Sequence, residues 1–278
     1  MARPLKIRSR RRDALPLRSG RIDLADPELC AMLAAGDVLR WRKRVPRLGP
    51  EAVAILFECF LRSRDSDRRI RVLDPCCGNG IVLAVLRSLY PRYLAALHGR
   101  DIDSRALEVT EHNLSILSSG EAMNQWIAEL LKRRDRTGSA RLDGVIERAH
   151  LLQARLVEGE PADHAAAVAT FIERQNVLAG VESDRSRVGE SQERFDLILT
   201  DPPYGRRSDW QESKWTGEIG LAVFLRRMVD CITPDGRIAV ALDPAVELPQ
   251  TEGLVIAERI ALPHRVGWVM RRSNPDHR

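Results

Sequence analysis

The sequence lacks the cysteine and histidine patterns that indicate a disulfide framework or a metal centre. It has five cysteines, an odd number, and no two of them have Cys-x-x-Cys spacing. None of its histidines form a His-x-x-x-His pair. Structural zinc sites and disulfide scaffolds depend on such spacings. We therefore expect no metal site and no disulfide framework.

Long apolar segments and phosphate-binding motifs are also missing. No uninterrupted apolar run reaches membrane-spanning length, and the N-terminus has no apolar core of a secretory signal. The chain contains neither Gly-x-Gly-x-x-Gly nor a Gly-Lys-Ser/Thr phosphate loop. With 44% hydrophobic and 30% charged residues, its composition is typical of globular proteins. We expect a soluble, cytoplasmic protein with no membrane partner and a ligand without phosphates.

Acidic residues are scarce near the N-terminus. Residues 1–72 contain eighteen basic and nine acidic side chains, whereas the whole chain has a net charge of only +5. Residues 1–20 are expected to form a flexible basic arm; they lack the serine-rich amphipathic length of an organelle transit peptide. A basic segment attached to a mildly acidic domain indicates attraction to a polyanion. A solvated charged tail is the alternative.

Residues 21–65 predict an N-terminal helical segment. Asp26 and Pro27 are typical of an N-cap and a first helical position, so one helix is expected from Asp26 to Ala35. A second helix is expected over residues 50–61, where the apolar side chains fall on one face.

Residues 66–278 predict an α/β domain, because short β-prone apolar runs alternate with helical patterns. The alternation is typical of a mostly parallel sheet covered on both faces, ending here in an antiparallel hairpin. The expected strands cover residues 70–73, 94–101, 176–181, 195–199, 237–242, 255–261 and 266–270. The expected helices of this domain cover residues 81–90, 104–117 and 221–232, with Pro234-Asp235-Gly236 ending the last.

One interval is too long for this pattern. The chain between Asp74 and Asp201 exceeds the length of three βα units at about 30 residues each. We assign the excess to a helical insertion over residues 118–174 at the sheet edge. Packing is its expected role, and a lid or substrate platform is the alternative.

A glycine-rich turn follows the first strand. Its glycines allow a tight turn and close approach of the backbone to a ligand, and the carboxylate before them suits a cation such as an amino group. Cys76 and Cys77 are expected to be small packing residues, not nucleophiles. The candidate cofactor-binding residues of this turn are Asp74, Pro75, Cys76, Gly78, Asn79 and Gly80.

Two further carboxylates lie at the end of the second strand, in Gly99-Arg100-Asp101-Ile102-Asp103. An acidic residue at this place in a nucleotide-binding α/β sheet accepts hydrogen bonds from ribose hydroxyl groups. Asp101 is the expected ribose partner. Asp103 is a second cofactor candidate and, alternatively, the N-cap of the next helix.

A proline-rich turn ends the fourth strand, as Asp201-Pro202-Pro203-Tyr204. Two prolines remove two backbone donors and fix φ, so the strand must end there. The turn presents a carboxylate, free carbonyl groups and an aromatic ring at the edge of the sheet where α/β proteins bind ligands.

These three motifs together resemble the class I S-adenosylmethionine-dependent methyltransferases, which have a Rossmann-like fold. Asp-Pro-Pro-Tyr matches the signature of members that methylate exocyclic amino nitrogens of bases. The chain is similar, over most of residues 25–272, to the avilamycin-resistance (AviRa-like) family of 23S rRNA guanine-N2 methyltransferases. That resemblance depends on Asp-Pro-Cys-Cys-Gly-Asn-Gly-Ile-Val-Leu, Asp-Ile-Asp-Ser-Arg-Ala-Leu and Thr-Asp-Pro-Pro-Tyr-Gly-Arg-Arg-Ser-Asp-Trp.

The resemblance implies S-adenosylmethionine as cofactor, ribosomal RNA as partner and a monomer. It makes Asp201, Pro202, Pro203 and Tyr204 the catalytic residues. Acceptors held by two prolines, Asp201 Oδ and the Pro202 carbonyl, would favour attack by a base amino group. Tyr204 would stack on an extruded base, with a core aromatic as the alternative.

Other interpretations stay open. Asp-Pro-Pro-Tyr also occurs in adenine-N6 methyltransferases of RNA or DNA, and an acidic residue that binds the cofactor's adenine is not identified; Glu182 and Asp184 are candidates. Arg206, Arg207 and Trp210 are candidates for contact with phosphates or a neighbouring base. A catalytically silent RNA-binding module is the non-enzymatic alternative.

Overall fold

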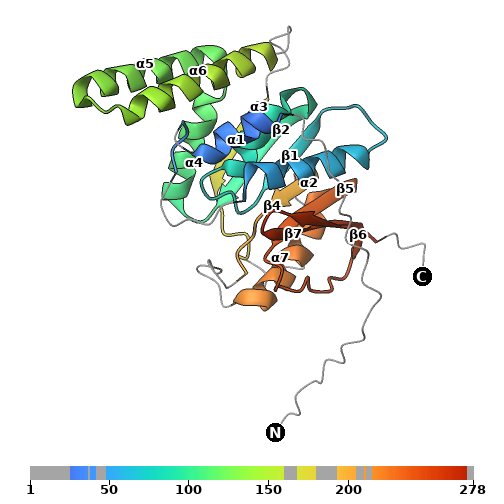
Figure 1. Cartoon of the computed structure of the whole chain (residues 1–278). Coiled ribbons are helices and arrows are strands. Elements are labelled where there is room, and N and C mark those ends of the chain that lie inside the picture. The colour runs from blue at the N-terminus through green and yellow to red at the C-terminus, as the bar shows by residue number, and fades with distance from the viewer. Residues whose placement is uncertain are drawn as a thin grey trace.

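Seven strands among the described residues form one sheet in the order β3-β2-β1-β4-β5-β7-β6 (Figure 1). The computed structural model describes residues 26–36, 38–41, 48–159, 168–179, 193–204, 210 and 215–273. The strands are β1 (Ile70–Asp74), β2 (Leu94–Asp101), β3 (Ala169–Arg174), β4 (Phe195–Thr200), β5 (Ile232–Leu242), β6 (Leu254–Leu262) and β7 (Arg265–Arg272). β7 is antiparallel to β5 and β6, and the other pairs are parallel. The expected Rossmann-like sheet with a terminal antiparallel hairpin is confirmed.

Helices cover both faces of this sheet. They are α1 (Pro27–Ala35), α2 (Pro50–Arg62), α3 (Ile81–Leu89), α4 (Ser104–Ile116), α5 (Gly120–Thr137), α6 (Arg141–Gly159) and α7 (Gly217–Cys231), with a 3-10 turn at Pro91–Tyr93. In the part of the chain that the structure describes, none of these helices combines the length and the apolar character that a membrane span requires.

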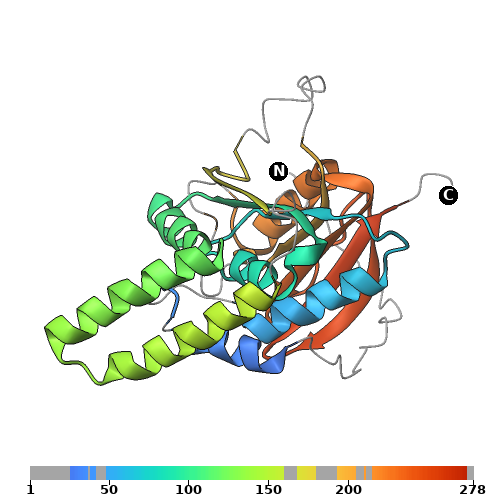
Figure 2. The same cartoon turned by 90° about the horizontal axis from the view of Figure 1, so that it is seen from above.

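Side-chain alternation along the strands separates two apolar layers. Val72, Leu197 and Ala239 face the layer that contains α1 to α6, whereas Leu73 and Ile198 face α7. Successive residues of a strand point to opposite faces, so a strand buried on both sides reads as a continuous apolar run. Figure 2 shows the strands between α2 on one side and α7 on the other.

The N-terminal helices begin as the sequence predicts. Asp26 caps α1, because its carboxylate accepts a hydrogen bond from the Leu29 backbone N–H at 2.8 Å. Pro27 occupies the first turn of that helix. Leu29 and Phe57 belong to the same apolar layer as α3, so these helices share the core of the sheet. The expected basic arm, residues 1–20, lies outside the described residues.

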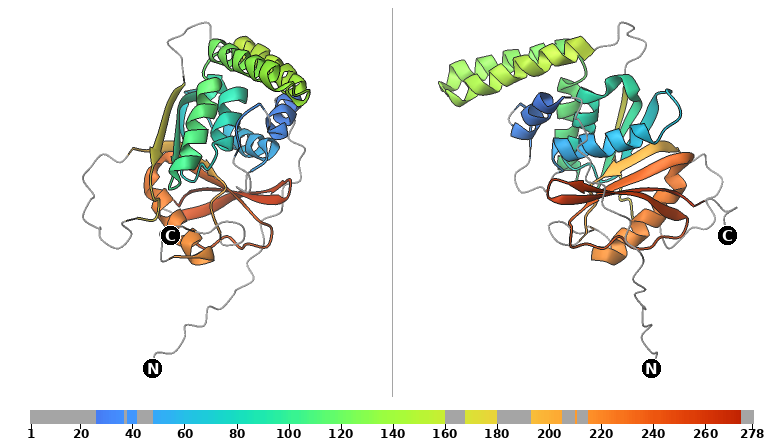
Figure 3. Two further views of the ribbon diagram at one scale, coloured as in Figure 1. Left: turned by 90° about the vertical axis from the view of Figure 1, so that its left-hand side faces the viewer. Right: turned by 45° about the vertical axis from the view of Figure 1, so that its right-hand side comes forward.

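The helical insertion is an antiparallel hairpin of α5 and α6 that extends beyond the sheet (Figures 1 and 3). Ser119 caps α5 through the Ala122 N–H, and Gly138 ends it in the left-handed conformation. Leu130 and Ile146 are buried in this part of the molecule. The insertion is confirmed as helical, but its helices span residues 120–159 rather than reaching residue 174.

The third strand lies at a different place from the one predicted. Residues 176–181 were expected to form it, whereas the structure has β3 at Ala169–Arg174, paired in parallel with β2. Residues 177–179 form a turn, in which the Asn176 side chain accepts a hydrogen bond from the Leu178 N–H at 2.9 Å. Asparagine favours such local turns over a ladder. Five of the six side chains of β3 are exposed, so no apolar alternation marked this edge strand.

The boundary between α7 and β5 was also predicted wrongly. α7 starts at Gly217, four residues early, and β5 starts at Ile232, where Pro234-Asp235-Gly236 was expected to form a turn outside the strand. The pairing of β4 with β5 shifts register there, from Phe195↔Ile232 to Leu197↔Arg237. The turn residues therefore bulge out of a continuing strand, which a local sequence pattern does not distinguish from a break.

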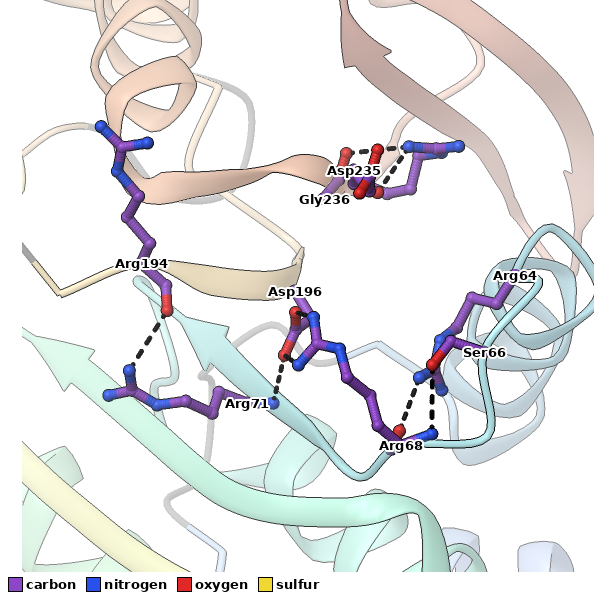
Figure 4. A network of polar contacts seen from close by, with 9 residues as sticks. Arg64, Ser66, Arg68, Arg71, Arg194, Asp196, Asp235 and Gly236 are labelled. Atoms are coloured by element: carbon purple, nitrogen blue, oxygen red, sulfur yellow. Dashed lines mark hydrogen bonds and ion pairs between the residues drawn. The ribbon is translucent and has the colours of Figure 1, made fainter.

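A buried carboxylate joins β1 and β4 at the amino end of the sheet (Figure 4). Asp196, 5% exposed, accepts the Arg71 backbone N–H at 2.9 Å and forms an ion pair with Arg68. Arg71 also donates to the Arg194 carbonyl at 3.3 Å. These contacts fix the relative position of two central strands, whose opposite ends carry Asp74 and Asp201.

Candidate active site

The glycine-rich turn between β1 and α3 is held in one conformation by its own backbone. Gly78 and Gly80 have φ of 52° and 76°, the left-handed region that favours glycine. The Gly80 N–H donates to the Cys77 carbonyl at 2.8 Å. A Cβ at Gly80 would lie 2.6 Å from Thr110 Cγ2, so only glycine fits against α4.

Asp101 is bonded to this turn. Its Oδ2 accepts the Gly78 N–H at 2.8 Å, and its Oδ1 accepts the Asp103 N–H at 2.9 Å. The Cys77 N–H donates to the Arg100 carbonyl at 2.9 Å. The end of β2 and the turn after β1 are therefore joined by hydrogen bonds into one unit. The role of Asp101 as ribose partner stays a prediction. Asp101 itself is half-buried.

Asp103 has a clear structural role. It is the N-cap of α4, and its Oδ1 accepts the Arg105 N–H at 2.9 Å. The alternative given for this residue is therefore confirmed. Contact of Asp103 with a cofactor stays a prediction, as it does for the other candidates in the turn.

Asp74 is the most deeply buried carboxylate of the site. It is 1% exposed, and its Oδ1 accepts the Cys76 N–H at 3.2 Å. Burial raises the pKa of Asp74 to about 7, and the nearby carboxylates of Asp101 and Asp201 contribute in the same direction. Three acidic groups from the ends of β1, β2 and β4 therefore meet at one edge of the sheet.

The neighbouring thiols do not supply a nucleophile. Burial, the largest cause, raises the pKa of Cys76 and of Cys77 well above the usual value for a thiol, and the Asp74 carboxylate adds to the effect. A thiol is a nucleophile only as the thiolate. This agrees with the packing role predicted for both cysteines. Among the described residues, no cluster of side chains suits a metal ion.

Two α4 side chains that the sequence analysis missed also hold the turn. Thr110 Oγ1 donates to the Gly78 carbonyl at 2.8 Å, and Asn113 Nδ2 to the Asn79 carbonyl at 3.3 Å. Asn113 also exchanges hydrogen bonds with the backbone of Arg40, at 2.8 and 2.9 Å. Both side chains are completely buried, and they occupy positions of α4 that its apolar pattern would assign to the core. Polar residues at core positions were the available signal.

The Asp-Pro-Pro-Tyr turn continues β4 at the same edge. Pro202 and Tyr204 are buried, and Asp201 and Pro203 are half-buried. The Asp201 carboxylate forms an ion pair with Arg265 Nη2 at 3.6 Å. Tyr204 is 9% exposed and belongs to the apolar layer of Leu73 and α7. The structure thus places its ring as the alternative expectation did, and stacking on a base stays a prediction.

Trp210 is a packing residue rather than an exposed base contact. It is 7% exposed, its ring lies 5.4 Å from that of Phe224, and a Cβ at Gly220 would collide with its indole. The remaining candidates, Arg206, Arg207, Glu182 and Asp184, lie outside the described residues.

The residues of the site fit S-adenosylmethionine. The cofactor carries an ammonium group, a sulfonium centre and a ribose diol, which suit an edge with three carboxylates and a glycine turn without phosphate-binding features. The Asn79 Oδ1 atom is buried without a hydrogen-bond partner, so an acceptor is left for a donor from outside the protein. Asp74, Asp101 and the turn 76–80 are the residues that would hold it.

Comparison with known proteins identifies the family. The model of the family "rRNA methyltransferase AviRa" matches residues 30–261. A 23S rRNA (guanine(2535)-N(1))-methyltransferase of Streptomyces viridochromogenes is 28% identical over 261 residues, which cover 90% of this chain and 95% of the relative. Two solved structures of the rRNA methyltransferase AviRa from that organism are 25% identical, with TM-scores of 0.68 and 0.69 over 91% of this chain and 94% of each of theirs. The chain belongs to the AviRa family of S-adenosylmethionine-dependent rRNA methyltransferases.

Proposed function

We propose that this protein methylates the Watson–Crick edge of a guanine in 23S rRNA. The observation that carries the proposal is the position of the Asp201-Pro202 turn beside Asp74 and Asp101, in a chain that resembles a 23S rRNA guanine methyltransferase over nine-tenths of its length. Bound S-adenosylmethionine supplies an electrophilic methyl group on its sulfonium centre. The protein must then bring a base nitrogen to that methyl group.

The chemistry of the turn favours guanine over adenine. Guanine presents two donors side by side on this edge, N1–H and the N2 amino group, whereas adenine presents one donor and one acceptor. The Asp201 carboxylate and the Pro202 carbonyl are two acceptors from adjacent residues. Because proline fixes the backbone here, these acceptors would need little reorganisation during the reaction.

N1 is the atom that we propose for methylation, because the relative that matches most of this chain is named an N1 enzyme. N2 is the second candidate, since the Asp-Pro-Pro-Tyr turn is typical of enzymes that modify exocyclic amino groups. In both reactions the nitrogen that forms the new bond to the methyl group loses one proton, and the Asp201 carboxylate would accept that proton in either case.

Two basic regions support RNA as the substrate. The first is the N-terminal segment, whose excess of arginine is visible in the sequence. The second is the end of the α5–α6 hairpin, where Lys132, Arg133, Arg136 and Arg141 are exposed. Between residues 132 and 143 five basic side chains stand against two acidic ones. RNA affinity should therefore fall steeply with salt.

Nucleoside analysis tests the function. Purified protein, S-adenosylmethionine and unmodified 23S rRNA are incubated, and the digested RNA is examined by mass spectrometry. We expect 1-methylguanosine; N2-methylguanosine would establish the second candidate. N6-methyladenosine, or no methylated nucleoside although the protein binds the cofactor, would overturn the proposal. The Asp201→Ala variant is the control for contaminating activity.

A monomeric state and a cytoplasmic location remain predictions. Light scattering of the purified protein tests the monomeric state.

A further inference from the structure

The terminal hairpin reaches the active-site edge through Arg265. Arg265 is the first residue of β7, directly after the turn residue His264, which has φ of 56°. Because β7 runs antiparallel to β5, its first residues lie beside the carboxyl end of β5, where Val266 pairs with Leu242. The topology therefore brings a side chain from near the C-terminus to the end of β4.

The contact that Arg265 makes there is with Asp201. Its Nη2 atom lies 3.6 Å from Asp201 Oδ2, and the two side chains are only 10% and 14% exposed. Its Nη1 atom donates to the His264 carbonyl at 3.1 Å, which holds the guanidinium in place. Salt screens such a mostly buried pair much less than a surface pair.

We infer that Arg265 is a positioning residue for Asp201. The ion pair between the guanidinium and Oδ2 restrains the orientation of the Asp201 carboxylate at the end of β4. A carboxylate held in this way is already oriented when the base arrives, which is how a preorganised acceptor lowers a barrier. The inference rests on the proposed function, because it gives Asp201 its role as acceptor.

The ion pair with Arg265 restrains the Asp201 side chain, which the two prolines of the turn do not restrain. The two prolines fix the backbone of the turn, but a proline ring does not restrain the χ1 and χ2 torsions of the preceding Asp201. Burial among like charges, Asp74 among them, would otherwise favour rotation of this carboxylate toward solvent. A cation on one oxygen opposes that rotation. Because Asp201 and Arg265 are 64 residues apart in the sequence, no local motif predicts their contact.

A double-mutant cycle tests the inference. The variants are Arg265→Gln, Asp201→Asn and the double variant, and Asn at 201 keeps an acceptor oxygen while removing the charge. With RNA and S-adenosylmethionine saturating, we expect Arg265→Gln to lower kcat by about ten- to a hundred-fold, with KM for the cofactor within two-fold. In the Asp201→Asn background the same change should cost less than about two-fold.

Two further variants separate positioning from folding. Arg265→Lys keeps the charge and should recover part of the lost kcat. Arg259→Gln is the matched control, since Arg259 lies on β6 of the same hairpin and its guanidinium sits 5.0 Å from the Trp268 ring instead of at Asp201. It should leave kcat unchanged.

Two results would overturn the inference. One is an equal loss from Arg265→Gln in both backgrounds, and the other is an unchanged kcat in Arg265→Gln. If the wild-type protein methylates guanine and these variants behave so, only the role of Arg265 fails. If the wild-type protein methylates no guanine, the proposed function fails as well.

Discussion

The glycine-rich turn after β1 and the α5–α6 hairpin each contain a glycine with positive φ, but the surroundings of the two glycines differ. The turn is bonded from three sides, by Asp101, Thr110 and Asn113. The hairpin packs mainly against itself and has a glycine of its own, Gly138, where α5 ends. The proposed cofactor-binding role of the turn requires one backbone conformation, whereas the hairpin only has to remain helical. Gly80 and Gly138 both have positive φ, so the same substitution at each position compares the two regions.

Replacing Gly80 by alanine should have the largest effect. With φ of 76° and a Cβ that would lie 2.6 Å from Thr110, the variant must distort the turn or displace α4. We expect S-adenosylmethionine binding, measured by calorimetry, to weaken by at least about a hundred-fold, because the backbone that approaches the ligand moves.

The hairpin supplies the matched control. Gly138 has φ of 62° but nothing within 4 Å of an added Cβ. Gly138→Ala should therefore cost only the ~1–2 kcal/mol of a left-handed alanine and leave cofactor binding unchanged. Equal loss of binding in both variants would mean that the turn is not the cofactor site.

A core substitution in the hairpin should separate local from global stability. Leu130 on α5 is 3% exposed, and Leu130→Ala should destabilise its surroundings by about 2–5 kcal/mol. Because α5 and α6 extend beyond the sheet, hydrogen exchange should accelerate in residues 120–159 with little change in cofactor binding. Leu83→Ala, in α3, is the comparison and should lower protection across the sheet.

The sequence predicted the turns at the ends of β1 and β4 far better than it predicted β3 and the distant side chains that hold these turns. Glycine and proline after a strand constrain the local backbone conformation, so a turn can be predicted from neighbouring residues alone. Residues 74–80 and 201–204 were identified as motifs for this reason. Asp103 could be assigned to a cap for the same reason. β3 could not, because its six residues form a strand only through pairing with β2. Arg265 and Asn113 were missed because each acts through tertiary contacts with a distant segment.

Asp101 and Asp103, at the end of β2 and the start of α4, offer a comparison between two neighbouring carboxylates. The Asp101 carboxylate accepts N–H groups from Gly78 and Asp103, whereas the Asp103 carboxylate caps α4 by accepting the N–H of Arg105. Asp101→Ala should weaken cofactor binding by about ten-fold or more, since hydrogen bonds to a charged group contribute about 1.5–3 kcal/mol. Asp103→Ala should cost about 1 kcal/mol of unfolding free energy and affect binding less. The reverse order would make Asp103 the ribose partner.

The pH dependence of stability should report the burial of Asp74. Burial raises its pKa from 3.8 to about 7 in the folded protein, so between these values the unfolded chain has lost a proton that the folded protein keeps. The free energy of unfolding should therefore fall as pH rises from about 4 to about 7 and then level off. Asp74→Asn mimics the protonated carboxyl and should remove this part of the slope. The free energy of unfolding of the variant should therefore exceed that of the wild type only at higher pH. Urea unfolding of the cofactor-free proteins at pH 5 and pH 8 measures the difference.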